Sequence, residues 1–426
     1  MKIAIIGTGI SGLGAAWLIS KKHNITLFEK NNRIGGHSNT LDINYYNNNI
    51  SVDTGFIVYN KKNYPNFVNL LRKLNVPTER SNMSFSVSFN NGEFEYEGSL
   101  VGIFSKLSNI YDKRFISMLF GILRFYNFAK SQSNHFDQNT NLKEFLNQYK
   151  YSDEFIKYHL LPMCSSIWSS PENEIMKYPI KSLIRFMDNH QLLNFFTRPK
   201  WRTIKGGSKN YIKKIQEGSN FRIIKNINIK SVIRNSDEVI IKTNDGRELI
   251  FDKIIYACSP KESIKMTKNI KKNEKQILEK FNFTKNKIYL HSDISLMPNR
   301  KLAWAAWNYL GNTKNNNKAT ITYWMNKLQN IDKDFPLFVT LNPLKIPKTK
   351  NIFRQLEYSH PVFDNLTMSS QKDLFKIQGK NNSYWCGAWT GNGFHEDGLN
   401  SAISVAKSLN VKIPWTNKIL SSENKR

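Results

Sequence analysis

The stretch that decides the fold reads Lys2-Ile3-Ala4-Ile5-Ile6-Gly7-Thr8-Gly9-Ile10-Ser11-Gly12. An apolar strand runs directly into three glycines with the G-x-G-x-x-G spacing, and small residues follow as the start of a helix. A second apolar strand, 25–28, ends on Glu29, which lies 22 residues after Gly7 (29 − 7). A dinucleotide-binding βαβ unit places its acid roughly 20 residues after the first glycine. The stretch therefore predicts a bound dinucleotide.

Each part of this pattern has a physical role. Gly7 permits the tight turn, Gly9 lets the backbone approach a pyrophosphate, and Gly12 lets helix and strand pack closely. The pyrophosphate then lies on the free N–H groups of the helix start, at Ile10 and Ser11. The Glu29 carboxylate can accept hydrogen bonds from ribose hydroxyls. The alternative is a glycine-rich turn in an unrelated parallel sheet, and the fingerprint alone does not separate FAD from NAD.

The bulk composition describes a folded globular protein. The chain has 426 residues, 40% of them hydrophobic and 13% aromatic, which is enough for two domains and a large core. Three cysteines lie far apart, which argues against a disulfide framework or a zinc site and fits a reducing compartment. The apolar N-terminus is too short for a signal peptide, and no apolar stretch reaches membrane-spanning length. We expect a cytoplasmic protein with no metal site.

The net charge of +29 has two explanations. An anionic partner such as the inner face of a membrane would attract such a chain. An AT-rich genome would also produce abundant lysine, asparagine and isoleucine. The basic residues are spread along the chain and the aromatic residues lack the patterns of RNA-binding modules, so we expect no nucleic acid.

The remaining chain suggests a domain built from separate pieces. Hairpins are predicted at 40–53 and 84–96, a helix at 64–74, and a buried parallel strand at 252–258. Residues 100–200 are helical and aromatic-rich, whereas 270–360 are rich in strands. We place the nucleotide-binding domain at 1–98, 205–268 and 370–416, the substrate domain at 99–204 and 269–369, and a polar tail at 417–426.

One helical segment, 115–126, is apolar on most faces and has basic residues at both ends. Such a segment can be an ordinary core helix, an interfacial helix, or the wall of an apolar substrate tunnel.

The longer pattern resembles the FAD-binding signature of the flavin-containing amine oxidase superfamily. The resemblance rests on Gly7-x-Gly9-x-x-Gly12-x-x-x-Ala16, Glu29 and Arg33-x-Gly35-Gly36, followed in order by Asp53-x-Gly55, Gly206-Gly207, Gly387 and Asp397-Gly398. It implies an α/β fold with a Rossmann-like, GR2-type FAD-binding domain and an inserted α+β substrate domain. It also implies an FAD-dependent oxidoreductase.

The resemblance implies a set of cofactor contacts. Val232 is expected to contact adenine through its backbone, and Asp397 to contact the ribityl chain. Lys30 or Arg33 is expected at the phosphates, because Asn31 and His37 stand where the family often has arginine. No cysteine matches the one that binds FAD covalently in some amine oxidases, so noncovalent FAD is expected. The full set is Gly7, Gly9, Ile10, Ser11, Gly12, Glu29, Lys30, Arg33, Gly35, Gly36, His37, Asp53, Thr54, Gly55, Phe56, Val232, Gly387, Asp397, Gly398 and Leu399.

Longer strings are similar to one bacterial subgroup that occurs alongside cyclopropane-fatty-acyl-phospholipid synthase-type methyltransferases. They include 52–60, 201–207, 302–309 and 393–399. The resemblance implies desaturation of methyl-branched phospholipid acyl chains, on the way to furan fatty acids, and a fatty-acyl methyltransferase as partner.

His395 and Glu396 are the catalytic candidates, because they precede the Asp397-Gly398 helix start that should face the flavin. The near-neutral reference pKa of histidine suits a general base. His395 could instead only pack against the ring or anchor the loop. Tyr323, Trp324, Tyr358 and His360 are candidates for the substrate pocket, with core packing as the alternative for each.

Three other functions remain open at this point. The first is an amine oxidase acting on a small amine, which the positive charge of the protein disfavours. The second is a flavin-binding partner of a methyltransferase without turnover of its own. The third is a dehydrogenase that uses NAD alone.

Overall fold

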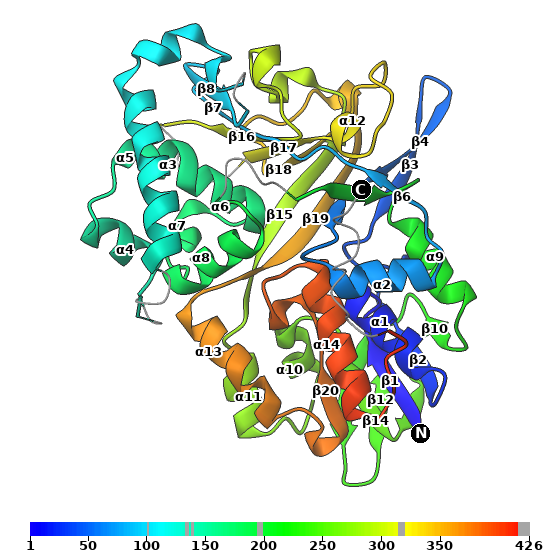
Figure 1. Cartoon of the computed structure of the whole chain (residues 1–426). Helices are drawn as coiled ribbons and strands as arrows, with labels where there is room; N and C mark the ends of the chain where they lie inside the picture. The colour runs from blue at the N-terminus through cyan, green and yellow to red at the C-terminus, as the bar shows by residue number, and fades with distance from the viewer. Residues whose placement is uncertain (100–101, 133–135, 138–139, 194–198, 314–319, 416–426) are drawn as a thin grey trace.

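One half of the molecule is built on a five-stranded parallel sheet (Figure 1, lower half). The computed structural model describes residues 1–99, 102–132, 136–137, 140–193, 199–313 and 320–415. The strand order is β10-β2-β1-β14-β20, with bounds Arg222–Ile224, Asn24–Phe28, Lys2–Ile6, Lys253–Tyr256 and Ser383–Trp385. The predicted buried strand at 252–258 is confirmed as β14, which pairs in parallel with β1 and β20.

Both faces of this sheet are covered, as its nearly continuous apolar strands require. One face packs against α1 (Ile10–Ile19), α9 (Lys209–Glu217) and α14 (His395–Ser408). The other face packs against a three-stranded sheet and two short helices. These are β11 (Ile229–Arg234), β12 (Val239–Thr243), β13 (Glu248–Phe251), α10 (Pro260–Met266) and α11 (Lys272–Leu278).

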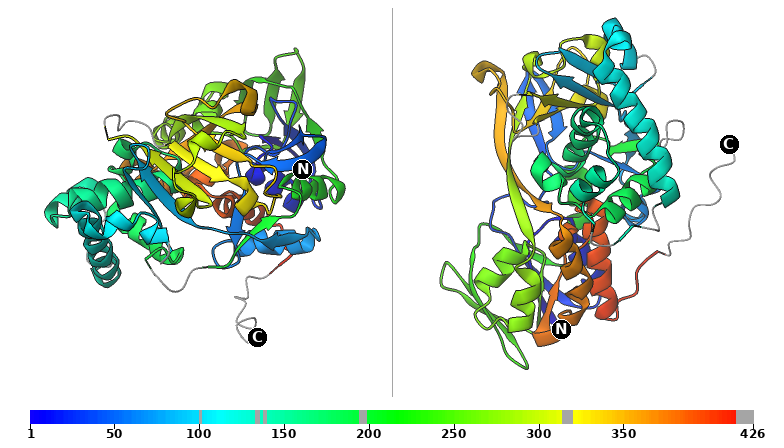
Figure 2. Two further views of the ribbon diagram at one scale, coloured as in Figure 1. Left: turned by 90° about the horizontal axis from the view of Figure 1, so that it is seen from above. Right: turned by 90° about the vertical axis from the view of Figure 1, so that its left-hand side faces the viewer.

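The other half contains a seven-stranded mixed sheet with helices packed beside it (Figures 1 and 2). Its order is β19-β15-β18-β17-β16-β7-β8, with bounds Ile352–Val362, Asn282–His291, Phe338–Leu341, Thr320–Trp324, Trp307–Gly311, Phe85–Phe89 and Phe94–Glu97. The helices beside it are α3 (Lys113–Gln132), α4 (Leu142–Gln148), α5 (Asp153–Phe155), α6 (Leu161–Trp168), α7 (Glu172–Ile175) and α8 (Ile180–Asn189).

Small elements connect the two halves. The predicted hairpin at 40–53 is confirmed as β3 (Thr40–Tyr45) and β4 (Asn48–Asp53), and the predicted helix at 64–74 is α2 (Pro65–Lys73). A three-stranded sheet joins β5 (Val58–Asn60), β9 (Trp201–Ile204) and β6 (Thr78–Arg80). The helices α12 (Met325–Leu328) and α13 (Asn365–Asp373) follow β17 and β19.

Two predicted domain boundaries are wrong. The hairpin β7–β8 was placed in the nucleotide-binding piece 1–98, but β7 pairs in parallel with β16 of the seven-stranded sheet. Ile277, Leu278 and Phe281 fall in the predicted substrate piece, but their side chains pack into the core beneath the five-stranded sheet. Both errors concern long-range packing, which a local pattern does not encode. The predicted polar tail, 417–426, lies outside the described residues.

Among the described residues, none of the helices has the length and apolar character that crossing a bilayer requires.

Candidate cofactor site

The fingerprint turn leaves one open position at the start of α1. Gly7 has a φ of +106°, and a Cβ on Gly12 would lie 2.0 Å from the Gly7 carbonyl oxygen, so neither position accepts a side chain. A Cβ on Gly9 would meet no atom within 4 Å. Gly9 is also the N-cap of α1, and no side chain caps this helix. The arrangement leaves N–H groups and open space for an anion.

A second glycine loop, at Gly35-Gly36, packs against the fingerprint turn. A Cβ on Gly36 would lie 2.9 Å from the Gly9 Cα, and the Gly35 N–H donates to the Thr8 carbonyl oxygen at 2.9 Å. The backbone of this loop therefore packs closely against the fingerprint turn. Arg33 was expected at a phosphate, but its Nη1 donates to the Gly36 carbonyl oxygen at 2.8 Å and holds this loop. Lys30 lies exposed beside it.

Glu29 stands beside the same turn at the end of β2. Its Oε2 accepts hydrogen bonds from the Thr8 N–H at 3.3 Å and the Thr8 hydroxyl at 2.5 Å. Its Oε1 accepts from the N–H and Nδ2 of Asn31, at 3.0 and 2.8 Å. The carboxylate is thus fixed beside the N-terminus of α1, where a ribose attached to a bound pyrophosphate would lie.

The loop 53–56 lies on the 35–38 loop. A Cβ on Gly55 would lie 2.3 Å from the His37 carbonyl oxygen, which also accepts the Phe56 N–H at 2.8 Å. The Thr54 hydroxyl donates to the Asn39 carbonyl oxygen at 3.0 Å. Three segments predicted to contact the cofactor therefore form one stack of loops.

Asp53 joins this stack to distant elements. Its Oδ1 accepts from the hydroxyls of Thr40 and Ser208, at 2.6 and 2.7 Å, and its Oδ2 accepts from Nε2 of Gln329 at 2.9 Å. Burial raises the pKa of this carboxyl, while these donors lower it. The sequence predicts a cofactor contact for Asp53, whereas the structure uses its carboxylate to join pieces of the protein.

The start of α14 completes the site. The helix begins at His395, three residues earlier than predicted, so His395, Glu396 and Asp397 form its first turn. A Cβ on Gly398 would lie 2.8 Å from both Ile10 Cγ2 and Ser11 Oγ, so the N-termini of α14 and α1 touch. Leu399 is buried, and a Cβ on Gly14 would contact its Cδ1.

Asp397 caps the N-terminus of its own helix, α14. Its Oδ2 accepts the Phe394 N–H at 2.9 Å in a capping box, and burial raises its pKa to about 6. Gly387, at the end of β20, donates its N–H to the Ser401 hydroxyl at 2.9 Å and so fixes the closing segment. The predicted contact of Asp397 with a ribityl chain stays a prediction.

His395 is buried where the loops and α14 meet. Its Nε2 is 2.8 Å from the Ser38 hydroxyl and 3.0 Å from the Tyr211 hydroxyl. Its ring stacks on Phe56 with centroids 3.6 Å apart. Burial, with a smaller contribution from the charge of His37, places the pKa of His395 well below its usual value. The imidazole is therefore neutral at pH 7, and it is a weaker base than the near-neutral pKa expected from the sequence.

Glu396 has a different environment. Its Oε1 and Oε2 accept the backbone N–H groups of Asn66 and Phe67, both at 2.9 Å. These donors lie in the first turn of α2, so the carboxylate caps that helix from outside. Burial raises the pKa of Glu396 to about 7. The geometry shows a helix anchor, and the catalytic role proposed from the sequence finds no support in these contacts.

Two of the four predicted pocket residues lie in this site. The Tyr358 hydroxyl accepts a hydrogen bond from Nδ2 of Asn39 at 2.8 Å and lies 2.7 Å from the Thr54 hydroxyl. The His37 ring lies 5.0 Å from that of Tyr358 and 5.2 Å from that of His360. Tyr358 and His360 are two residues apart on β19 and share a face.

The other two predicted pocket residues lie on β17. Tyr323 packs edge-on against Trp307, and Trp324 packs edge-on against Trp304. As neighbours on a strand, Tyr323 and Trp324 face opposite sides of the sheet. They do not share one surface.

The prediction for Val232 finds no support either. Its carbonyl oxygen accepts the Lys268 N–H at 2.9 Å, and it pairs with Ile241 inside the three-stranded sheet. The backbone beside Glu29 is that of Ile227, whose N–H donates to the Glu29 carbonyl oxygen at 3.0 Å. The adenine contact of Val232 stays a prediction.

Sequence reasoning missed three residues of the site. Ser38 and Asn39 directly follow Gly35-Gly36-His37, so their place in the chain was a usable signal. Tyr211 comes one turn into α9, and only the tertiary structure brings its hydroxyl to His395.

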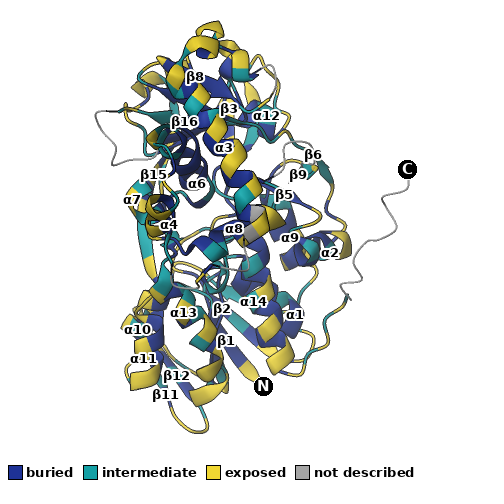
Figure 3. Ribbon diagram, turned by 60° about the vertical axis from the view of Figure 1, so that its left-hand side comes forward, coloured by how far each residue is buried: buried dark blue, intermediate teal, exposed yellow. Residues whose placement is uncertain are grey.

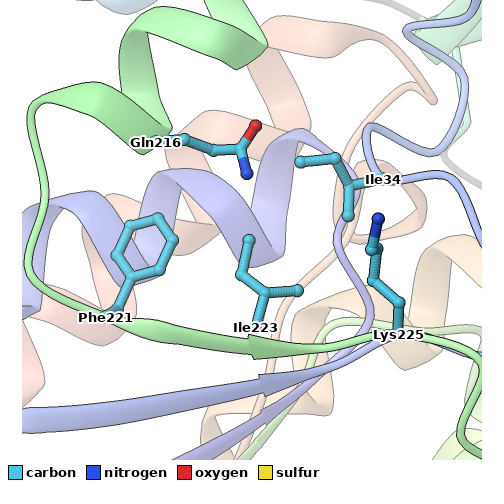
Figure 4. A pocket seen from close by; sticks show the side chains of 5 residues that line it. All are labelled: Ile34, Gln216, Phe221, Ile223 and Lys225. Atoms are coloured by element: carbon cyan, nitrogen blue, oxygen red, sulfur yellow. The ribbon is translucent and has the colours of Figure 1, made fainter.

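A cavity of about 380 Å³ lies at the edge of the same domain (Figure 4). Ile34 and Gln216 approach it from the glycine loop and α9, and the other lining residues, Phe221, Ile223 and Lys225, come from β10 and its flanks. Ile34 is the neighbour of Gly35, so the cavity lies beside the glycine loop and outside the cluster around His395.

Residues 10–280 match the sequence profile of the flavin containing amine oxidoreductases. The chain belongs to this family. The flavin-containing amine oxidoreductase family implies a flavin cofactor and an oxidoreductase activity. The open position at Gly9, the uncapped start of α1 and the fixed carboxylate of Glu29 fit such a cofactor.

Comparisons with solved structures agree on the fold. Two solved structures each match 96% of the chain at 12% identity: a CLA-producing fatty acid isomerase from P. acnes (TM-score 0.68, 98% of that chain) and a cyclohexylamine oxidase from Brevibacterium oxydans IH-35A (TM-score 0.65, 99% of that chain). A 4,4'-diapophytoene desaturase of Staphylococcus aureus (strain Newman) is 57% identical over 42 residues, which are 10% of this chain and 8% of the desaturase. The matched part thus spans under a tenth of that relative.

Proposed function

We propose that the protein is an FAD-dependent dehydrogenase of a hydrophobic substrate, with a methyl-branched phospholipid acyl chain as the substrate class. The observation that carries the proposal is the neutral His395, held by Ser38 and Tyr211 where the cofactor loops and the start of α14 meet.

The cofactor in this proposal is FAD, bound noncovalently. The start of α1 would hold the pyrophosphate and Glu29 the adenosine ribose. The loops 35–38 and 53–56 and the start of α14 would border the flavin ring. A bound flavin supplies a hydride acceptor.

The residues of this chain supply the proton chemistry. Forming a double bond removes a hydride from one carbon and a proton from the neighbouring carbon, and His395 Nε2 can accept that proton. The hydroxyls of Ser38 and Tyr211, which hydrogen-bond to each other, can pass that proton on. Phe56 covers one face of the imidazole and fixes its orientation.

Aromatic side chains next to α14 support a hydrophobic substrate. Phe394 stacks on Phe186 of α8 with centroids 5.2 Å apart, and Trp168 of α6 lies 4.7 Å from Tyr178. Trp168 Nε1 and the Tyr178 hydroxyl are buried without a hydrogen-bond partner. These aromatic side chains lie where the helical region contacts Phe394, the residue that precedes His395.

The names of similar proteins divide between lipid-like and amine substrates. The isomerase is named for a fatty acid and the desaturase for 4,4'-diapophytoene, whereas the cyclohexylamine oxidase is named for an amine. A net charge of +29 disfavours a cationic amine and favours an anionic lipid. We therefore prefer the acyl chain. A non-catalytic flavin-binding partner of a fatty-acyl methyltransferase is the second candidate, because the subgroup strings point to such a partner.

The test is lipid profiling of cells that express this chain with and without a fatty-acyl methyltransferase. We expect new unsaturation in methyl-branched chains only when both proteins are present. His395→Ala should retain flavin absorbance and lose the new product. If the product persists in this variant, the protein acts without this histidine and the proposed mechanism is wrong. If no acyl change occurs with the wild type, the acyl substrate is wrong.

A further inference from the structure

An exposed apolar surface lies on the helical region, away from the cofactor site. Seven of the sixteen exposed large apolar side chains of the described residues fall between 104 and 123. Leu107 is 76% exposed, Tyr111 86% and Phe120 68%. The full set is Phe104, Leu107, Ile110, Tyr111, Ile116, Phe120 and Leu123. We call this set the apolar surface.

The helix α3 is apolar on two opposite faces. Phe115, Met118, Ile122 and Phe125 are buried in the core, while Ile116, Phe120 and Leu123 recur at i, i+4 and i+7 on the outside. Figure 3 shows exposed turns along α3. An outer stripe of this kind is unusual, because a surface helix normally presents polar residues to water. It marks an interaction site.

The apolar surface is formed by two helices that follow one another in the chain. A short helix at Leu107–Tyr111 carries the exposed side chains of Leu107, Ile110 and Tyr111 and leads through Asp112 into α3. Its side chains therefore extend the stripe at the N-terminal end of α3.

Basic side chains border the apolar surface. Between 104 and 124 the chain carries Lys106, Lys113, Arg114 and Arg124 against one acid, Asp112. Arg114 pairs with Asp112 and with Glu93, each at 2.8 Å, so its charge offsets one of these two carboxylates. Lys113 and Arg124 are exposed at either end of the stripe, and Lys150 lies beside Arg124, which donates to its carbonyl oxygen.

We propose that this apolar surface binds to the face of an anionic phospholipid bilayer, with Leu107, Tyr111 and Phe120 inserted among the lipids and the bordering lysine and arginine side chains at the phosphates. Apolar side chains with a basic border are the arrangement that such an interface requires. The net charge of +29 adds long-range attraction. The basic border complements the anionic headgroups, and the seven-residue apolar set fits the hydrocarbon region below them.

The test is cosedimentation of the full chain with phosphatidylcholine vesicles, with and without phosphatidylglycerol. We expect binding that requires the anionic lipid and weakens with salt. The double variant Leu107→Asp/Phe120→Asp should reduce the partition coefficient at least about tenfold, since each substitution removes an apolar side chain that would be buried in the lipid. Lys113→Glu should reduce it severalfold, about as expected for a surface charge near anionic lipid.

Matched controls sit on the other half of the molecule. Ile250→Asp/Phe375→Asp changes two equally exposed apolar residues, and Lys21→Glu changes an exposed lysine. The proposal is overturned if the controls lose as much binding as the test variants, or if the wild type does not bind anionic vesicles. Self-association that only the double variant abolishes, without vesicle binding, would identify an interface between copies instead. Flavin absorbance in every variant reports the cofactor site separately.

Discussion

Asp53 and Ser208 are joined by three hydrogen bonds, although 155 residues separate them. The Ser208 N–H donates to Oδ1 at 2.9 Å and to Oδ2 at 3.1 Å, and the Ser208 hydroxyl donates to Oδ1 at 2.7 Å. Ser208 is the N-cap of α9. Gln329 binds the same carboxylate, so one buried acid fixes β4, α9 and the segment after α12 relative to each other.

Asp53→Asn should therefore destabilise the protein strongly. The amide keeps the volume but turns one acceptor into a donor that faces other donors, and we expect a loss of ~2–4 kcal/mol in the free energy of unfolding. Urea unfolding measures it. Asp42→Asn is the control, because Asp42 pairs with Lys209 at the exposed surface and should change stability by less than ~1 kcal/mol. Equal losses in the two variants would contradict the role of Asp53.

Gly9→Ala and Gly12→Ala should separate cofactor binding from folding. Gly9 has an extended backbone with open space at its Cβ, so alanine fits the protein but occupies the space of the pyrophosphate. We expect an unchanged melting temperature without cofactor and a loss of flavin. In Gly12→Ala the new Cβ would lie 2.0 Å from the Gly7 carbonyl oxygen, so both stability and flavin should fall. The ratio of flavin to protein absorbance and thermal melting test both. Flavin retained in Gly9→Ala would place the pyrophosphate elsewhere.

His395→Asn should keep the flavin and lower turnover by about 10²–10⁴-fold, the usual contribution of a positioned base. Ser38→Ala should lower it less, because the Tyr211 hydroxyl still holds Nε2. Single-turnover flavin reduction with substrate measures both. Wild-type reduction rates in His395→Asn would show that the imidazole only packs against Phe56.

Glu396→Gln should weaken the anchor of α2. A carboxylate accepts both the Asn66 and Phe67 N–H groups, whereas an amide accepts only one. We expect a loss of ~1–3 kcal/mol, measured by urea unfolding. Glu262→Gln, at the exposed start of α10, is the control and should be nearly neutral. If both variants unfold at the same urea concentration, the α2 contact adds nothing to stability.

His159 should make the protein sensitive to acid. Burial lowers its pKa to about 4, whereas in the unfolded chain the pKa is 6.5. Below pH 6.5 the unfolded chain binds the proton and the folded chain does not, so stability is lost as the pH falls toward 4. The slope is about 1.4 kcal/mol per pH unit.

His159→Gln removes this titrating group. Subtracting the unfolding free energy of the variant from that of the wild type at each pH cancels the contribution of the carboxyls, which titrate in both proteins. We expect the variant to be less stable at neutral pH and to lose less stability between pH 6.5 and 4. Parallel stability profiles for the two proteins would show that His159 charges equally in both states.

The sequence by itself determined the dinucleotide fold and the segments that would hold the cofactor. The roles of Gly7, Gly9, Gly12 and Glu29 follow from steric rules and helix-start chemistry that act within a few residues. The closing helix was also expected, although its start lies at His395 and not near Gly398.

Only the tertiary structure decided what the individual polar groups do. In the folded protein Asp53 binds Ser208, Glu396 caps α2, and His395 hydrogen-bonds to Ser38 and Tyr211. The hairpin β7–β8 pairs with the seven-stranded sheet. A local pattern shows which residue can donate or accept a hydrogen bond. Its partner comes from a part of the chain one hundred or more residues away, and it is selected by how the whole core packs.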